Sequence, residues 1–230
     1  KPISQLLKSD TLSKKRREQI TEVKSIRKFA HETLKLPING SYTSFVEVEK
    51  KAVTWNIVAT KKYSINPIQT CFLVGGCVSY LVYFNKIRAE KEAQKHRKLG
   101  NDVHIIASPA YSTLGFFDDP IVSTMFTGSI SSTAEVVFHE LGHQRLFRKN
   151  NSAFNEAFAS AVGEEGTRLW LQKEHPKLLE NYKDHVKKRW QFFNLLLKTS
   201  EELKIFYAQQ HSDIQAAKGK ARIFEELRNR

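Results

Sequence analysis

The strongest chemical signal in the sequence is a pair of histidines four residues apart with a glutamate between them. His139, Glu140 and His143 form an H-E-x-x-H pattern inside the apolar-periodic stretch 133–146. On an α-helix, residues i and i+4 lie one above the other on the same face, so the two imidazoles can bind one metal ion. Glu140, next to His139, is placed to take a proton from a metal-bound water molecule. The pattern predicts a metal centre with a general base beside it.

A third metal ligand is expected among three downstream glutamates, Glu156, Glu164 and Glu165. Glu156 is favoured because its neighbours are apolar, and a carboxylate is costly to bury unless it is paired or binds a metal. Glu164 and Glu165 lie in a more polar stretch, which favours solvated or ion-paired roles. Two imidazoles and one carboxylate leave a fourth zinc position open, as in catalytic sites. We therefore expect one Zn²⁺ ion held by His139, His143 and Glu156.

The string HELGH followed by FNEAFAS resembles the gluzincin metallopeptidases, and the chain more closely resembles the bacterial family of predicted aminopeptidases. Four blocks carry this resemblance: Cys71–Phe84, Ala110–Pro120, the zinc region Thr133–Leu171 and Leu203–Arg228. The resemblance implies zinc bound by His139, His143 and Glu156, with Glu140 as the general base. It also implies a gluzincin-like catalytic core and an exported protein of the periplasm or cell envelope, with a signal segment upstream of this chain.

The chain departs from the family pattern in two places. The gap between His143 and Glu156 is shorter than in the better-known gluzincin aminopeptidases, and Leu81-Val82 stands where an Arg-Gly pair is expected. The first departure bears on the third ligand, and the second bears on substrate choice.

The function predicted from these residues is zinc-dependent hydrolysis of a peptide substrate, with aminopeptidase action implied by the resemblance. A zinc endopeptidase of the cell envelope uses the same chemistry and is an alternative. A second alternative is a non-catalytic, zinc-stabilised basic binding protein. An exopeptidase needs an acid to bind the substrate ammonium group, and the available acids are Asp118, Asp119, Glu164 and Glu165.

Tyrosine hydroxyls are candidates for stabilising the oxyanion, a role that a tyrosine fills in gluzincin aminopeptidases. Tyr207 lies in the C-terminal family block and is the first candidate, with Tyr182 and Tyr111 as rivals. For each of them a packed, amphipathic tyrosine is the favoured interpretation. By analogy with thermolysin-like folds, Val103–Thr113 is expected to form a cleft wall that pairs with an extended substrate. Asp118-Asp119 either faces the substrate amine or begins a turn.

The only two cysteines, Cys71 and Cys77, are separated by five residues, which is not the spacing of a zinc knuckle or a thioredoxin-type motif. They are either two buried free thiols or a disulfide around a tight turn. Because the family resemblance points to export, the disulfide is favoured.

The periodicity predicts an α+β, helix-rich chain with a small, mostly antiparallel sheet, zinc helices and a helical C-terminal half. We expect a single metallopeptidase domain over residues 1–230. Its parts are a helical arm at 1–40, a mixed α/β cleft wall at 41–130, and zinc-binding and C-terminal helices at 131–230.

Composition is that of a globular protein: the 230 residues are 40% hydrophobic and 27% charged, with a net charge of +13. The positive charge is either a solvated surface or a contact with an anionic envelope surface. No recognised nucleic-acid motif accompanies it, so no specific nucleic acid is predicted as a partner. The apolar run 71–84 is too short to span a bilayer. The sequence offers no basis for assigning an oligomeric state.

Overall fold

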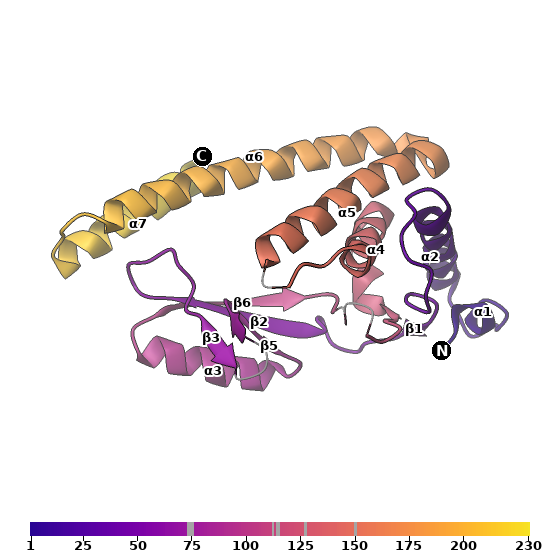
Figure 1. Cartoon of the computed structure of the whole chain (residues 1–230), viewed down its shortest axis with the longest axis horizontal. Helices are drawn as coiled ribbons and strands as arrows, with labels where there is room; N and C mark the ends of the chain where they lie inside the picture. The colour runs from indigo at the N-terminus through magenta and orange to yellow at the C-terminus, as the bar shows by residue number, and fades with distance from the viewer. Residues whose placement is uncertain (73–75, 112, 114–115, 127, 150) are drawn as a thin grey trace. The chain divides into compact units, whose positions relative to one another are not determined.

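The computed structural model describes residues 1–72, 76–111, 113, 116–126, 128–149 and 151–230 (Figure 1). Two compact units make up the chain, and each is assembled from separate pieces of sequence. The first unit contains Lys1–Val53 and Pro109–Val186, and the second contains Thr54–Ser108 and Lys187–Arg230. The predicted α+β, helix-rich class is confirmed. The single-domain description stays a prediction.

The first unit is mainly helical. Its elements are α1 (Ile3–Leu6), α2 (Lys14–Glu32), β1 (Phe45–Val46), β7 (Ile121–Val122), the 3₁₀ helix η1 (Ser123–Phe126), α4 (Ile130–Arg145), α5 (Ser152–Glu174) and the first part of α6 (Pro176–Tyr207). Strands β1 and β7 pair in parallel, with Phe45 opposite Ile121.

Helix α2 contributes directly to the core of this unit. Its apolar residues Ile20, Val23 and Ile26 are fully buried, and the ring of Phe29 lies 6.1 Å from that of Phe138 on α4. These residues recur at intervals of three, which places them on one face of the helix. The N-terminal segment predicted as an arm therefore holds α4 from one side.

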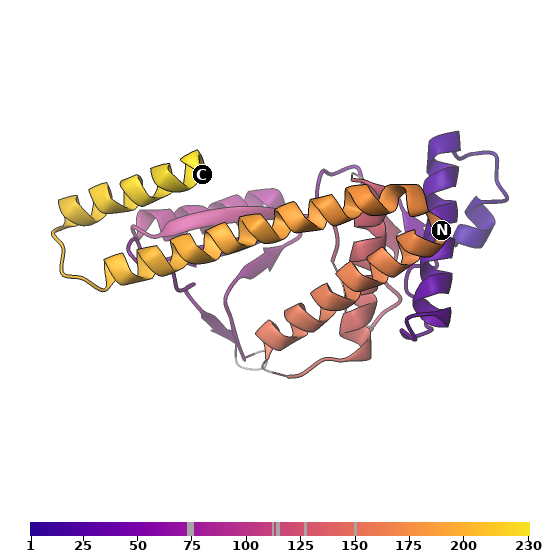
Figure 2. The ribbon, with the colours of Figure 1, turned by 90° about the horizontal axis from the view of Figure 1, so that it is seen from above.

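Helices α4 and α5 lie against each other along their lengths (Figures 1 and 2), and two glycines allow the close approach. A Cβ atom added to Gly163 of α5 would lie 2.9 Å from the backbone oxygen of Glu135 on α4. A Cβ added to Gly142 of α4 would lie 3.3 Å from the Cα of Ala159 on α5. Any side chain at position 163 would collide with the backbone of α4. The two helices can therefore pack this closely only because residue 163 is a glycine.

The second unit contains a three-stranded antiparallel sheet of order β5-β2-β6, and α3 packs across β2 and β6 (Figure 1). Its elements are β2 (Thr54–Thr60), β3 (Thr70–Phe72), β4 (Gly76–Val78), β5 (Leu81–Tyr83), α3 (Lys86–Lys98), β6 (Asp102–Ser108), the remainder of α6, and α7 (Asp213–Asn229). The highly charged segment Lys86–Lys98 forms α3, and Asp102–Ser108 after it forms β6. Most strand pairs of the chain are antiparallel, as predicted, and β1–β7 is a parallel exception.

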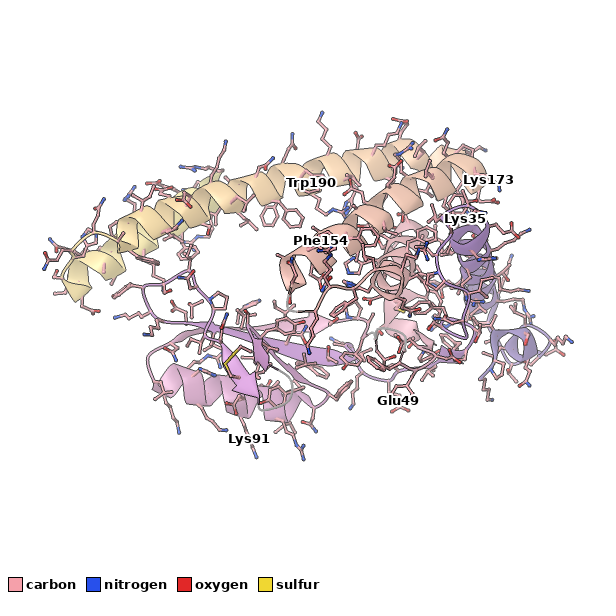
Figure 3. All side chains as sticks on the ribbon, viewed as in Figure 1. Lys35, Glu49, Lys91, Phe154, Lys173 and Trp190 are labelled. Carbon is pink, nitrogen blue, oxygen red and sulfur yellow. A yellow bond between two sulfur atoms is a disulfide. The ribbon has the colours of Figure 1, made fainter. Side chains whose placement is uncertain are left out.

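Cys71 and Cys77 form a disulfide between the paired strands β3 and β4, drawn as the yellow bond in Figure 3. The favoured pairing is confirmed. The described part of this apolar run forms β3, β4 and β5, and Tyr80 and Phe84 within it are half or more exposed. Residues 73–75 of this block, and residues 112 and 114–115 of the block Ala110–Pro120, lie outside the described residues.

Within the described part of the chain, none of the helices combines the length and the apolar character needed to cross a membrane.

The close approach of α4 and α5 predicts that Gly163→Ala lowers the melting temperature. Alanine gains about 1 kcal/mol of helix propensity over glycine, but its methyl group meets a backbone oxygen, and overpacking of this kind costs about 1–3 kcal/mol. Gly163→Val should lower the melting temperature further. Thermal unfolding followed by circular dichroism measures both, with Ser160→Ala, at an exposed position of α5, as the control. A melting temperature raised by Gly163→Ala would contradict the packing argument.

Candidate metal centre

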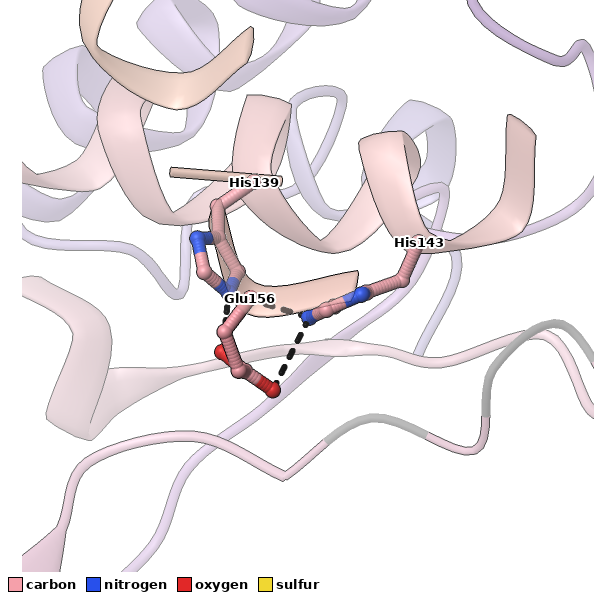
Figure 4. Close-up of side chains that lie close together, drawn as sticks. All are labelled: His139, His143 and Glu156. Carbon is pink, nitrogen blue, oxygen red and sulfur yellow. Dashed lines mark hydrogen bonds and ion pairs between the residues drawn. The ribbon is translucent and has the colours of Figure 1, made fainter. Parts of the chain in front are cut away.

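Two histidines on α4 form the floor of the candidate site. Ser129 caps the N-terminus of this helix by accepting a hydrogen bond from the backbone N–H of Ser132. Two turns further on, His139 and His143 project from one face, as the i, i+4 spacing predicted. Their Nε2 atoms lie 3.1 Å apart, with the rings edge to face (Figure 4).

Glu156, from the first turns of α5, completes the cluster. Its Oε2 lies 3.5 Å from Nε2 of His139, and its Oε1 lies 3.6 Å from Nε2 of His143 (Figure 4). Tetrahedral ligands about 2.0–2.1 Å from a zinc ion lie about 3.3 Å from one another. The three donor atoms are therefore spaced as one small cation requires, and His139, His143 and Glu156 form a group that could hold a metal.

Burial keeps the two imidazoles in the neutral form that binds metals. Desolvation lowers the pKa of His139, and the neighbouring His143 lowers it further, while Glu156 and Glu135 act in the opposite direction. Desolvation also lowers the pKa of His143, and Glu156 again opposes the shift. The lowered pKa values favour the uncharged imidazole, the form in which a histidine can bind a metal.

The short connection between the second histidine and Glu156 is held by Asn155. Helix α4 ends at Arg145 and α5 begins at Ser152, so only a short loop joins them. The buried Asn155 side chain accepts a hydrogen bond from the backbone N–H of Arg148 (2.7 Å) and donates one to its backbone oxygen (2.9 Å). This pair of bonds folds the loop against the start of α5, which brings Glu156 to the histidines despite the short gap.

Tyr182 on α6 also holds α4 in place, through a hydrogen bond to Glu135 that the sequence did not predict. Tyr182 is 5% exposed, and its hydroxyl donates to Oε2 of Glu135 (2.9 Å) and also lies 3.2 Å from the backbone oxygen of Glu164. Glu135 lies one turn before His139 on α4. The hydroxyl of Tyr182 thus ties the start of α6 to both α4 and α5.

The remaining candidate residues are placed as follows. Glu140 follows His139 on α4 and is half-buried; its role as general base stays a prediction. Glu165 forms an ion pair with Arg168 at 2.7 Å. Asp119 is buried and accepts a hydrogen bond from the backbone N–H of Thr113 at 2.9 Å, which favours the turn interpretation for this acid.

Three other predicted residues are Asp118, Tyr111 and Tyr207. The carboxylate of Asp118 lies so close to Gly40 that a Cβ atom on that glycine would collide with it. Burial lowers the pKa of Arg27, and the negative charge of Asp118 acts in the opposite direction. Tyr111 is about half exposed. Tyr207 belongs to the second unit, where its ring contacts Tyr63.

Comparison with known proteins places the chain in a family. A family model described as "Putative aminopeptidase" matches residues 1–230, the full length of the sequence. The chain belongs to this family. No curated protein and no solved structure matches it. Family membership supports peptidase activity on a peptide substrate, in agreement with the resemblance carried by the four sequence blocks.

The geometry predicts one bound zinc ion per chain and a graded loss of affinity in three variants. Glu156→Gln and His143→Ala each remove a ligand and should abolish stoichiometric binding. Asn155→Ala leaves all three ligands but frees the loop, so affinity should fall about 10–100-fold, as when other outer partners of a metal site are removed. Competition with a chromogenic chelator measures these affinities. Glu165→Gln, on the same helix but paired with Arg168, is the control and should bind as the parent does. Unchanged zinc binding by Glu156→Gln would exclude it as a ligand.

The lowered histidine pKa values predict how the metal-free protein responds to acid. Above the ordinary pKa of 6.5 both folded and unfolded histidines are neutral, so they add no pH dependence. Below it the unfolded chain binds protons that the folded site resists, so the free energy of unfolding falls as the pH drops. Urea unfolding between pH 7.5 and pH 5 measures this, and His139→Gln with His143→Gln should flatten the profile. An equal slope in that double variant would assign the pH dependence to other groups.

Proposed function

We propose that this protein is a zinc-dependent aminopeptidase with a gluzincin-type catalytic core, in which His139, His143 and Glu156 bind one zinc ion. The observation that carries the proposal is the spacing of the three donor atoms, 3.1, 3.5 and 3.6 Å from one another on two packed helices. The family description supports the same class of activity.

In this proposal Glu140 is the group that moves protons. A zinc ion in this site would polarise the scissile carbonyl and lower the pKa of its water ligand toward neutrality. Glu140 accepts the proton of the attacking water and passes it to the departing amine. The buried histidines hold fixed orientations because α4 is packed on both sides, by α2 and by α5. The chain would thus supply a preorganised ligand set and one carboxylate that carries a proton from water to the departing amine.

The oxyanion and the substrate backbone need further groups from the chain. Tyr182 is an unsuitable oxyanion donor because its hydroxyl already binds Glu135 and it is buried. Tyr207 and Tyr111 therefore remain as candidates. Strand β6 is at the edge of its sheet, as the addition of an extended peptide requires, and pairing of the substrate with Val103–Thr113 stays a prediction.

Aminopeptidase action requires an acid for the substrate ammonium group. Of the four acids that the sequence offered, Glu165 is paired with Arg168 and Asp119 binds backbone. Glu164, which lies on α5 together with Glu156, is the first of these acids to test, and Asp118 is the second. Glu164→Gln should raise KM for peptides with a free amino terminus more than for blocked ones.

The proposed location is the periplasm or cell envelope, supported by the Cys71–Cys77 disulfide, because such bonds persist in oxidising compartments.

Hydrolysis of matched free and N-acetylated peptides by the zinc-loaded protein tests the proposed function. Free peptides should lose one residue at a time, and acetylated peptides should remain intact. Glu140→Gln should lower kcat by at least about 1,000-fold, since the general base and its electrostatic effect are lost together, while zinc content stays at one ion per chain. Liquid chromatography with mass spectrometry measures the products.

Each other outcome changes the assignment. Cleavage of acetylated peptides would identify an endopeptidase with the same metal centre. Glu140→Gln with most of its activity retained would remove Glu140 from the mechanism. Zinc-loaded protein that cleaves no peptide in a broad panel would favour a zinc-stabilised binding protein.

A further inference from the structure

A cavity of about 450 Å³ lies within the second unit, and none of its lining residues belongs to the metal centre. Sites for small molecules typically measure about 300–1,000 Å³. The walls come from the end of β2 and the loop after it, the start of β6, the second half of α6, and α7. The C-terminal family block, which the proposed mechanism uses only through Tyr207, supplies much of this lining.

The larger part of the cavity wall is apolar. Leu203 forms a buried part of the lining, and Leu196 and Phe224 are each 37% exposed beside it. A ligand that covered these two side chains would remove apolar surface from water, which favours binding by about 25 cal/mol per Å². The wall therefore fits an aliphatic or aromatic group.

Two hydroxyl groups in the lining have hydrogen-bonding capacity to offer. Within the described part of the chain, neither the Tyr207 hydroxyl nor the Ser200 hydroxyl makes a hydrogen bond. The Tyr207 ring is held by contacts with Tyr63 and Phe206, with ring centres 5.8 and 5.9 Å away. Burial, followed by the charge of Asp102, raises the pKa of Tyr207, so its hydroxyl is a proton donor throughout the neutral range.

The charged groups around the cavity are paired with one another. Lys220 forms an ion pair with Asp102 and donates a hydrogen bond to the backbone oxygen of Lys62 at 2.9 Å. The ammonium group of Lys62 in turn binds Asp213 at 3.0 Å. A charged head group would have to compete with these pairs, whereas a neutral polar group would leave them intact.

We propose that this cavity binds an uncharged amide, with its apolar part against Leu196, Leu203 and Phe224 and its polar end at Tyr207 and Ser200. The amide oxygen accepts a hydrogen bond from the Tyr207 hydroxyl, and the amide N–H donates to the Ser200 oxygen. Such a group occurs in an amide-linked acyl chain and in an apolar residue of a peptide. The inference goes beyond the proposed function, since it involves no metal and no hydrolysis.

Isothermal titration calorimetry of the full, zinc-loaded chain with octanamide, octanoate and octylammonium tests the proposal. Octanamide should bind one molecule per chain, at least about tenfold more tightly than either charged analogue, because their head groups gain no unpaired partner in the cavity. N-acetyl-leucinamide, titrated in parallel, distinguishes the sources: tighter binding than octanamide indicates a peptide, and weaker binding indicates an acyl chain.

Variants separate the cavity from the metal centre. Tyr207→Phe keeps the ring and removes the hydroxyl, so octanamide affinity should fall about two- to tenfold. Ser200→Trp fills the cavity and should abolish binding. Ile205→Ala, at an exposed position of α6 outside the lining, should bind as the parent does. Glu140→Gln should also bind normally, so failure of the peptidase proposal leaves this test interpretable.

Three results would overturn the inference. The first is octanoate or octylammonium binding as tightly as octanamide. The second is binding that neither Tyr207→Phe nor Ser200→Trp weakens. The third is a Tyr207→Phe variant that binds octanamide with full affinity but has lost peptidase activity. That result would indicate that the Tyr207 hydroxyl stabilises the oxyanion and does not bind the amide.

Discussion

The arrangement of the metal centre depends on the close packing of α4 against α5. Two of the proposed ligands lie on one helix and the third on the other, so the separation of the helices sets the separation of the donor atoms. Gly163 contributes by having no side chain where one would meet the backbone oxygen of Glu135, and Gly142 does so more mildly beside Ala159. A shift of about 1 Å between these helices would move Glu156 out of the range at which carboxylates bind zinc. Gly142 of HELGH therefore allows the two helices to approach closely, while His139 and His143 beside it are candidate metal ligands.

The loop that joins α4 to α5 is short, and hydrogen bonds within this region hold it in place. A short connection between two packed helices limits how the second helix can turn back toward the first. Asn155 replaces the missing backbone pairing by binding both the N–H and the oxygen of Arg148. Asn155, which precedes Glu156, thus has a structural role of its own in holding this loop. It explains how this chain brings Glu156 close to the two histidines across a short loop.

The sequence predicted what depends on local periodicity and left open what depends on distant pairing. The positions of His139 and His143 on one helical face and the disulfide within one hairpin involve residues close together along the chain, and Glu156 lies near the histidines on the neighbouring helix. The burial expected for Glu156 is wrong, because its side chain is 63% exposed. The parallel pair of Phe45 with Ile121, and the contact of Tyr182 with Glu135, join residues that no periodic pattern relates. The same holds for the two units, since each combines segments separated by more than fifty residues.

The unequal burial of the three ligands indicates from which side a substrate reaches the site. The His143 side chain is 6% exposed and that of His139 is 24% exposed, whereas that of Glu156 is 63% exposed. The imidazoles therefore form the closed floor, and the carboxylate lies at the open side. The buried His143 and the partly exposed His139 are held by packing, while the exposed carboxylate supplies charge that water partly screens. Glu140, next to His139 on α4, is half-buried, and its role as the group that transfers a proton from water to a leaving amine stays a prediction.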